Sequence, residues 1–204
     1  GHLIVGNRNA GKCVALTFDD GPHKTYTPEI LDILDEYGAK ATFFIVGQNA
    51  EENPDIVLDA YRRGHEIGNH TYTHPNLKNL SAEKRLEEIQ KTQEILTDIT
   101  GEAPRLFRPP GGYVSNSIIE ELDALDCSAV LWSWRQDTRD WACPGVDCVV
   151  SGVLKNLRDG DIILFHDYNA GKNSPTPQAL RRILKSLSDD GYRFVTVSEL
   201  SRVD

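Results

Sequence analysis

Short apolar runs alternate with longer amphipathic segments along nearly the whole chain, and this alternation most constrains its fold. The expected strands are 14–18, 41–46, 66–69, 106–107, 129–134, 161–165 and 193–197, and the expected helices are 27–38, 54–63, 81–100, 116–125, 146–157 and 176–189. Strands separated by helices pair in parallel, so the pattern predicts an α/β fold with helices outside a parallel sheet. In such folds functional side chains gather at the carboxyl ends of the strands. The alternation alone does not distinguish a closed barrel from an open doubly wound sheet.

Local signals mark the ends of several expected helices. Thr27 and Pro28 are typical of a helix start, with Thr27 as the cap and Pro28 at the first position. Ser81 is expected to cap the long helix that follows it, and Gly101 to end that helix. No linker, repeat or low-complexity tract interrupts the pattern, so we expect a single domain.

The composition is that of a globular domain with an acidic balance of charge. The chain has 204 residues, of which 26% are charged, and a formal net charge of −9. Tight binding to nucleic acid or to an anionic membrane needs basic patches, so neither partner is expected. No apolar run approaches the length of a membrane span. We expect a monomer that makes no membrane contact.

The start of the chain indicates a processed or trimmed product. It opens at Gly1-His2 and contains no Met. We therefore expect residues 1–12 to be an N-terminal extension or an expression remnant, and residues 13–204 to form the domain.

Four cysteines leave the redox environment open. Cys143 and Cys148 bracket a short loop, and a disulfide between them would fit an oxidising compartment. Free thiols are the alternative, with Cys13 and Cys127 buried as small apolar side chains. No Cys-x-x-Cys spacing occurs, which argues against a thiolate zinc site.

Two adjacent acids, Asp19 and Asp20, end the first expected strand and precede Gly21-Pro22. Neighbouring strand side chains point to opposite faces, but a turn at this point can bring both carboxylates into one cleft. Adjacent carboxylates are unfavourable unless a cation, a partner charge or a proton relieves them. Taken alone, the pair is better explained by an acid that caps a turn.

His70 and His74 follow the strand expected at 66–69. Their spacing of four places both imidazoles on one face of a helical turn, where they can converge on a metal ion. A solvated pair of loop histidines is the alternative. With an Asp from the first strand end, the pair makes a two-His, one-carboxylate site, which leaves positions open for water and substrate.

Three further strand ends carry residues with chemical potential. Arg108 precedes Pro-Pro-Gly-Gly, whose glycines let the backbone approach a ligand closely. Trp141 beside Asp140 would make a sugar or acyl platform, against the alternative of an ordinary packed Trp. His166 ends another strand and is a natural general acid.

These five stretches, in this order, resemble the five signature motifs of carbohydrate esterase family 4, the polysaccharide deacetylases with a NodB-homology domain. The resemblance extends over residues 13–200. It implies a distorted, incomplete (β/α) barrel in a single catalytic domain.

The resemblance also implies roles for individual residues. Asp19 matches the catalytic base, and Arg108 matches the arginine that orients it. His166 matches the catalytic acid, and Asp140 matches the carboxylate that tunes it. One divalent metal ion is implied, with zinc expected and cobalt or another divalent ion as alternatives; its ligands would be Asp20, His70 and His74.

The implied substrate contacts include one departure from the family. Trp141 and Leu164 match residues that line the pocket for the acetyl methyl group. Gly111 stands where the family commonly has a Tyr whose backbone N–H helps to bind the oxyanion. A glycine keeps that N–H, and Tyr113 is a candidate to fill part of the space.

The implied activity is metal-dependent removal of acetyl groups from N-acetylglucosamine residues in a polysaccharide, with peptidoglycan or a chitin-like oligomer as the expected substrate. O-deacetylation of acetylated xylan would use the same residues. A catalytically inactive sugar-binding module is the alternative from another class. The expected location is extracellular or at the cell surface, with the targeting segment absent from this chain.

Overall fold

A computed structural model of the chain describes residues 3–142, 145–171 and 173–202. Its strands are β1 (Leu3–Ile4), β2 (Cys13–Asp19), β3 (Ala41–Ile45), β4 (Glu66–Asn69), β5 (Leu106–Phe107), β6 (Ser128–Val130), β7 (Ile162–His166) and β8 (Arg193–Phe194). Its α-helices are α1 (Tyr26–Glu36), α2 (Gly47–Glu52), α3 (Pro54–Arg62), α4 (Ala82–Thr100), α5 (Asn116–Asp123), α6 (Val146–Asn156), α7 (Thr176–Asp189) and α8 (Val197–Ser201). Two short 3-10 helices are η1 (Leu77–Asn79) and η2 (Pro110–Gly112).

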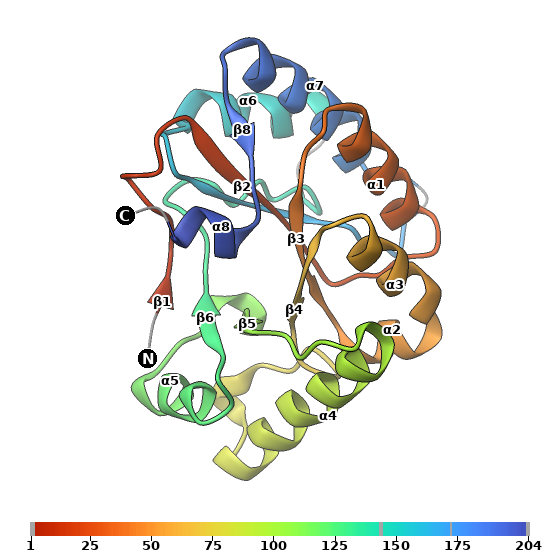
Figure 1. Cartoon of the computed structure of the whole chain (residues 1–204), viewed down its shortest axis with the longest axis vertical. Coiled ribbons are helices and arrows are strands. Elements are labelled where there is room, and N and C mark those ends of the chain that lie inside the picture. The colour runs from red at the N-terminus through yellow and green to blue at the C-terminus, as the bar shows by residue number, and fades with distance from the viewer. Residues whose placement is uncertain (1–2, 143–144, 172, 203–204) are drawn as a thin grey trace.

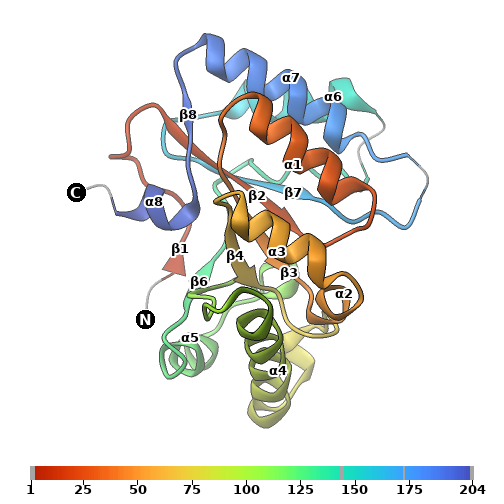
Figure 2. The same cartoon turned by 45° about the vertical axis from the view of Figure 1, so that its right-hand side comes forward.

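The strands form one parallel sheet in the order β1-β6-β5-β4-β3-β2-β7, with β8 also paired to β2 (Figure 1). Neighbouring helices pack in the series α6, α7, α1, α3 and α4 along the outer side of the sheet (Figure 2). Beyond β6 the backbone turns toward β7, where the Ser133 N–H donates to the Ile162 carbonyl at 3.0 Å. The sheet therefore curls into the expected incomplete barrel.

Alternating side chains along β2 divide the core into two parts. Leu16 and Phe18 pack beneath the outer helices, whereas Ala15 faces the inside of the curled sheet with Phe44. All four are buried, as the period of two along a strand requires when both faces are covered. The carboxyl end of β2, which leads into the inner cleft, is thus covered on both faces of the strand.

Some expected elements differ from those observed. The strand expected at 129–134 ends at Val130, because residues 131–138 leave the β6 ladder and run beside β7. The strand expected at 193–197 ends at Phe194, and α8 follows it. Neither α8, α2 nor β1 is indicated by the apolar periodicity, since each is six residues or shorter.

The first helix begins earlier than expected, at Tyr26 rather than after a Thr27 cap. The imidazole Nδ1 of His23 accepts the N–H groups of Thr25 and Tyr26 at 3.1 and 3.2 Å, and thereby caps this helix. Thr27 lies within the first turn, and its hydroxyl donates to Asp167 at 2.7 Å. The predicted cap was wrong because the side chain of His23, three residues before the first helical residue, satisfies this helix end.

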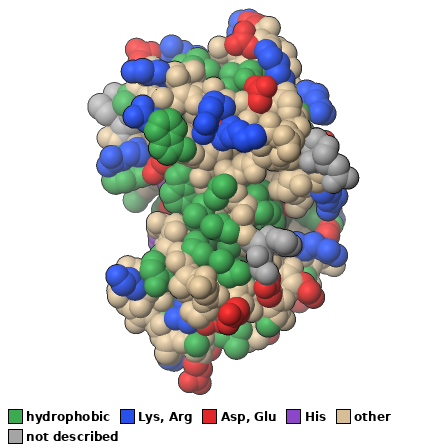
Figure 3. All heavy atoms as spheres, turned by 90° about the vertical axis from the view of Figure 1, so that its left-hand side faces the viewer, with side chains coloured by type: hydrophobic (Ala, Val, Ile, Leu, Met, Phe, Trp, Pro, Cys, Tyr) green, Lys and Arg blue, Asp and Glu red, His purple; other side chains and the backbone are tan. Residues whose placement is uncertain are grey.

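The N-terminal segment lies against the domain. β1 pairs with β6, and the Asn7 N–H donates to the Gly160 carbonyl at 2.9 Å. The Arg8 guanidinium pairs with the buried Asp161 carboxylate at 2.6 Å. On this side of the molecule hydrophobic side chains form a band flanked by basic ones (Figure 3), and Leu3 and Val5 are among the exposed apolar residues.

Two remaining expectations concern membranes and thiols. None of the described helices is long and apolar enough to cross a membrane. Cys13 and Cys127 are buried free thiols, as expected. The Cys143–Cys148 pairing involves Cys143, which lies outside the described residues.

Candidate active site

The two adjacent acids at the end of β2 reach the same cleft by different means. Asp19 shares the inner face of the strand with Thr17 and is 4% exposed. Continued extension would turn Asp20 to the opposite face. Instead Asp20 has a left-handed φ of 81°, and its carboxylate lies within 3.2 Å of the same imidazole nitrogen of His70 that Asp19 approaches at 3.7 Å. The turn therefore places both carboxylates beside one another.

Arg108 is fully buried and holds Asp19. Its Nη1 donates to Asp19 Oδ1 at 2.8 Å and to the Thr17 hydroxyl at 2.7 Å. Its Nη2 donates to the Leu131 carbonyl at 2.7 Å, and the guanidinium lies 4.3 Å from the centre of the Phe44 ring. A buried ion pair with this many hydrogen bonds orients one carboxylate oxygen rigidly and leaves the other directed into the cleft.

The two histidines expected to bind metal come together, but on a loop. Residues 70–76 contain no helix, and both Thr71 and His74 have positive φ values, 71° and 61°. The predicted helical turn was wrong, because the loop bends through these left-handed residues instead. The Nε2 atoms of His70 and His74 lie 3.2 and 3.3 Å from Asp20 Oδ1.

The donor set fits a divalent metal ion. Ligand atoms of Asp20, His70 and His74 all lie within 4.8 Å of one another. Asp20 Oδ1 and His70 Nε2 are buried, and neither has a hydrogen-bond partner among the residues that the structure describes. His70 Nδ1 lies 2.7 Å from the Arg108 carbonyl, which only accepts, so the ring proton is on Nδ1 and the Nε2 lone pair faces Asp20. Orphaned acceptors that converge in this way are those that a cation satisfies.

The electrostatics of Asp20 agree with this assignment. Burial favours the neutral acid, but the neighbouring imidazoles of His70 and His74 hold the pKa of the Asp20 carboxyl far below its usual range. The Asp20 carboxylate in turn raises the pKa of His74. The site therefore keeps an ionised carboxylate available for a cation across the whole physiological pH range.

His166, which is half-buried, and the buried Asp140 form a second pair at the same cleft. His166 Nδ1 lies 2.8 Å from Asp140 Oδ1. Asp140 Oδ2 accepts the backbone N–H of His166 at 2.8 Å and the Thr176 hydroxyl at 2.6 Å. Burial lowers the pKa of His166, yet the hydrogen bond and charge of Asp140, together with the charges of Asp19 and Asp20, raise that pKa to about 9. The imidazole Nε2 lies 4.0 Å from Asp20 Oδ2, so the charged ring faces the metal-binding residues.

Asp167 is a buried acid whose function the sequence did not reveal. It follows His166 at the end of β7, and its carboxylate accepts the Gly21 N–H at 3.2 Å and the Thr27 hydroxyl at 2.7 Å. Burial raises the pKa of Asp167 to about 7. A Cβ atom on Gly21 would come within 2.6 Å of this carboxyl group, so only glycine fits the turn after Asp20. The local signal was the pair His166-Asp167 itself.

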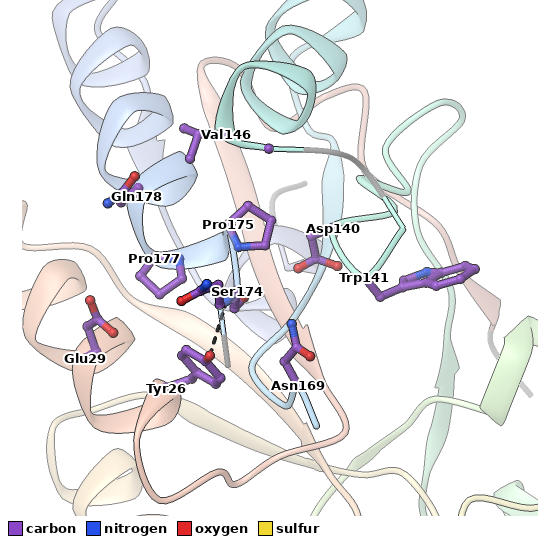
Figure 4. Close-up of a pocket in the computed structure, with 12 residues that line it drawn as sticks. Tyr26, Glu29, Asp140, Trp141, Val146, Asn169, Ser174, Pro175, Pro177 and Gln178 are labelled. Atoms are coloured by element: carbon purple, nitrogen blue, oxygen red, sulfur yellow. Dashed lines mark hydrogen bonds between the residues drawn. The ribbon is translucent and has the colours of Figure 1, made fainter. Parts of the chain in front are cut away.

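Two cavities include residues of the centre in their linings. One, of about 540 Å³, is bordered by Asp140 and Trp141 and continues between the N-terminal ends of α1 and α7 (Figure 4). The other, of about 340 Å³, is lined by His74, Gly111 and Tyr113. No atom lies within 4 Å of a Cβ built on Gly111, so the space left by the missing side chain is open.

The two residues expected to line the acetyl pocket, Leu164 and Trp141, differ in their exposure to solvent. Leu164 is buried in β7, where its carbonyl accepts the Thr138 hydroxyl and ties the 136–140 loop to the sheet. Trp141 is 65% exposed, and its ring extends away from the Asp140 side chain (Figure 4). Trp141 therefore borders the larger cavity from its rim.

Comparison with known proteins gives a family and a relative that match this chain. The family model for polysaccharide deacetylase matches residues 6–130. A peptidoglycan-N-acetylglucosamine deacetylase from Bacillus cereus is 47% identical over 95% of this chain and 90% of its own length.

Solved structures also superpose closely. The Bc1960 peptidoglycan N-acetylglucosamine deacetylase matches with a TM-score of 0.91 and 39% identity, over 97% of this chain and 91% of that protein. BA3943, a pseudoenzyme of carbohydrate esterase family 4 from Bacillus anthracis, matches with a TM-score of 0.90 and 31% identity, over 99% of this chain and 69% of that protein. The family match, the closeness of these relatives and the barrel they share lead to one conclusion: this chain belongs to the polysaccharide deacetylase family.

Proposed function

We propose that this protein hydrolyses the acetamido group of N-acetylglucosamine residues in a polysaccharide, and that peptidoglycan is its substrate. The carrying observation is the convergence of Asp20, His70 and His74 between two oriented partners, the Arg108-held Asp19 and the Asp140-held His166. The choice of peptidoglycan is supported by the relative from Bacillus cereus, which is a peptidoglycan deacetylase. By the same reasoning the protein acts on cell-wall material outside the cytoplasm.

The residues divide the labour of amide hydrolysis. A divalent cation held by Asp20, His70 and His74, zinc in our proposal, would supply positive charge beside the acetyl carbonyl and the attacking water. Asp19 removes the proton from that water as it attacks the carbonyl carbon. Arg108 keeps the base in place throughout, because its guanidinium binds the carboxylate oxygen that faces away from the cleft.

The second half of the reaction needs an acid and an oxyanion donor. The backbone N–H of Gly111 donates to the oxygen that gains negative charge. His166 then protonates the sugar nitrogen as the carbon–nitrogen bond breaks, because an unprotonated amine is a poor leaving group. Its raised pKa of about 9 keeps the imidazole charged at neutral pH. The products are acetate and an amino sugar, so atoms and charge balance.

The two flanking cavities favour a polymer over a free monosaccharide. One adjoins Asp140 and the other adjoins His74, so a sugar whose acetamido group lies at the centre has open space near two of the site residues. The larger cavity offers amide, hydroxyl and aromatic groups that suit sugar hydroxyls, including Tyr26, Asn169 and Gln178 (Figure 4). These cavities therefore have room for further sugar units of a polymer.

The testing experiment is acetate release from a panel of substrates by the purified protein, with zinc, with cobalt and after chelation. We expect release from peptidoglycan with metal and a loss of activity on chelation. Release from acetylated xylan but from no N-acetylated polymer would assign the protein as an O-deacetylase. No release from any member of the panel, by metal-loaded protein, would support an inactive sugar-binding module instead.

A further inference from the structure

We propose that Glu88, which lies on α4 and outside all five sequence motifs, is the positioning residue for the loop that carries the histidine ligands. The proposal rests on the proposed function, because it concerns the metal site that this function requires. Glu88 touches neither a ligand side chain nor the substrate cavities beside Asp140 and Gly111. Its effect is exerted through the backbone of residues 72 and 73.

Three hydrogen bonds converge on this one carboxylate. Glu88 Oε2 accepts the N–H groups of Tyr72 and Thr73 at 2.8 and 2.9 Å. Glu88 Oε1 accepts the Thr73 hydroxyl at 2.6 Å. Hydrogen bonds to an ionised acceptor are stronger than those between neutral groups. A helix side chain thus fixes two consecutive peptide groups of the ligand loop.

The positions of His70 and His74 depend on these Glu88 hydrogen bonds to different degrees. His70 follows β4 directly: its N–H donates to the Ile45 carbonyl at 3.0 Å, and its ring is held by the Arg108 carbonyl. His74 comes four residues later and its side chain is 43% exposed. Between them the backbone passes through left-handed Thr71, and His74 is itself left-handed. Such conformations are unfavourable for residues with a Cβ and persist only where neighbouring groups hold them.

A second residue of α4, Lys91, also contacts this loop. The Lys91 ammonium lies 3.7 Å from the centre of the Tyr72 ring. Positions 88 and 91 are three apart, so both side chains leave the same face of α4. The Gln48 N–H also donates to the Tyr72 carbonyl at 3.1 Å. Of these contacts, Glu88 alone binds Thr73, the residue next to His74.

The test is the affinity of the full chain for Zn²⁺, measured by competition with a chromophoric chelator. Groups that orient metal ligands typically contribute about ten- to a hundredfold to affinity. We expect Glu88→Ala to weaken Zn²⁺ binding by about tenfold or more, within that range. Glu88→Gln keeps the length of the side chain and one oxygen acceptor, which can still accept the Tyr72 and Thr73 N–H groups, and it is expected to restore most of the affinity. Co²⁺ absorption spectra give a second readout, since a displaced His74 changes the ligand field.

A matched control lies one residue away. Glu87 is 59% exposed and pairs with Lys84 at the helix surface, so Glu87→Ala is expected to bind Zn²⁺ like the parent. Equal Zn²⁺ affinity and equal Co²⁺ spectra in the parent and Glu88→Ala would overturn the proposal. If Glu88→Ala does not fold, Glu88→Asp replaces it. The shorter side chain should weaken Zn²⁺ binding, and an unchanged Zn²⁺ affinity would also overturn the proposal. A parent protein that binds no Zn²⁺ would contradict the proposed function itself.

Discussion

Replacing Asp140 with Asn should shift the pH dependence of turnover. The change keeps the size of the side chain but removes the charge 2.8 Å from His166 Nδ1. Burial then disfavours the imidazolium with less opposition, so the pKa of His166 falls from about 9 toward its unperturbed 6.5. Because His166 must carry a proton to act as the acid, the high-pH limit of activity moves down with it.

The magnitude follows from the size of the shift. A fall of about two pKa units corresponds to about 3 kcal/mol of lost preference for the imidazolium. At pH 8.5 only about 3% of His166 would then be protonated, and turnover should drop about thirtyfold relative to its own low-pH plateau. A bound cation lowers this pKa in both proteins, so the difference between the two profiles is the quantity to measure.

The assay is acetate release across the pH range under saturating substrate, with metal content determined at each pH. Asp137→Asn is the matched control, because it removes an exposed charge from the same loop and should leave the limb unchanged. A high-pH limb that stays in place in Asp140→Asn, while the overall rate drops, would refute the electrostatic coupling. Asp140 would then act only by orienting groups through its bonds to the His166 N–H and the Thr176 hydroxyl.

Three further outcomes are expected. Asp19→Asn should retain its metal and lose about a hundred- to ten-thousandfold in turnover, and a near-parental rate with metal bound would exclude Asp19 as the base. His70→Ala should lose most of its bound metal by elemental analysis, and full stoichiometry would show that the ligand set is wrong. Burial lowers the pKa of His65 to about 4, whereas an unfolded histidine titrates near 6.5. The unfolded state therefore takes up the proton first, and stability is complete above pH 6.5 and declines as the pH falls toward 4. Denaturant titrations at pH 7 and pH 4.5 should show His65→Phe losing less stability over this interval than the parent, by up to about 3 kcal/mol.

Much of the site was predictable because its residues stand at strand ends. Asp19 and His166 end a strand, His70 and Arg108 directly follow one, and parallel strands bring their carboxyl ends to one edge. Local pattern therefore sufficed to gather these side chains. It did not assign their partners: the pairing of Asp140 with His166 and of Arg108 with Asp19 came from the resemblance to a family, and the structure now shows both contacts.

What remained unpredictable depends on contacts between distant segments. Glu88 meets Thr73 from a separate helix, and Asp167 meets Gly21 across 146 residues of sequence. The helical spacing of His70 and His74 suggested a turn that does not exist, because the loop is shaped by Glu88 and Asn69 rather than by its own periodicity.

The sequence by itself determined the parallel α/β class, the edge at which chemistry gathers and the residue types found there, since side-chain periodicity and strand ends are local properties. Tertiary structure alone decided that Asp20 turns back beside Asp19 and that the 131–138 segment curls the sheet toward β7. It also decided that the carboxyl group of Glu88 binds the backbone of residues 72 and 73, and that the carboxyl group of Asp167 binds the turn at Gly21. Each of these depends on a conformation or contact that is stable only when remote segments pack against it.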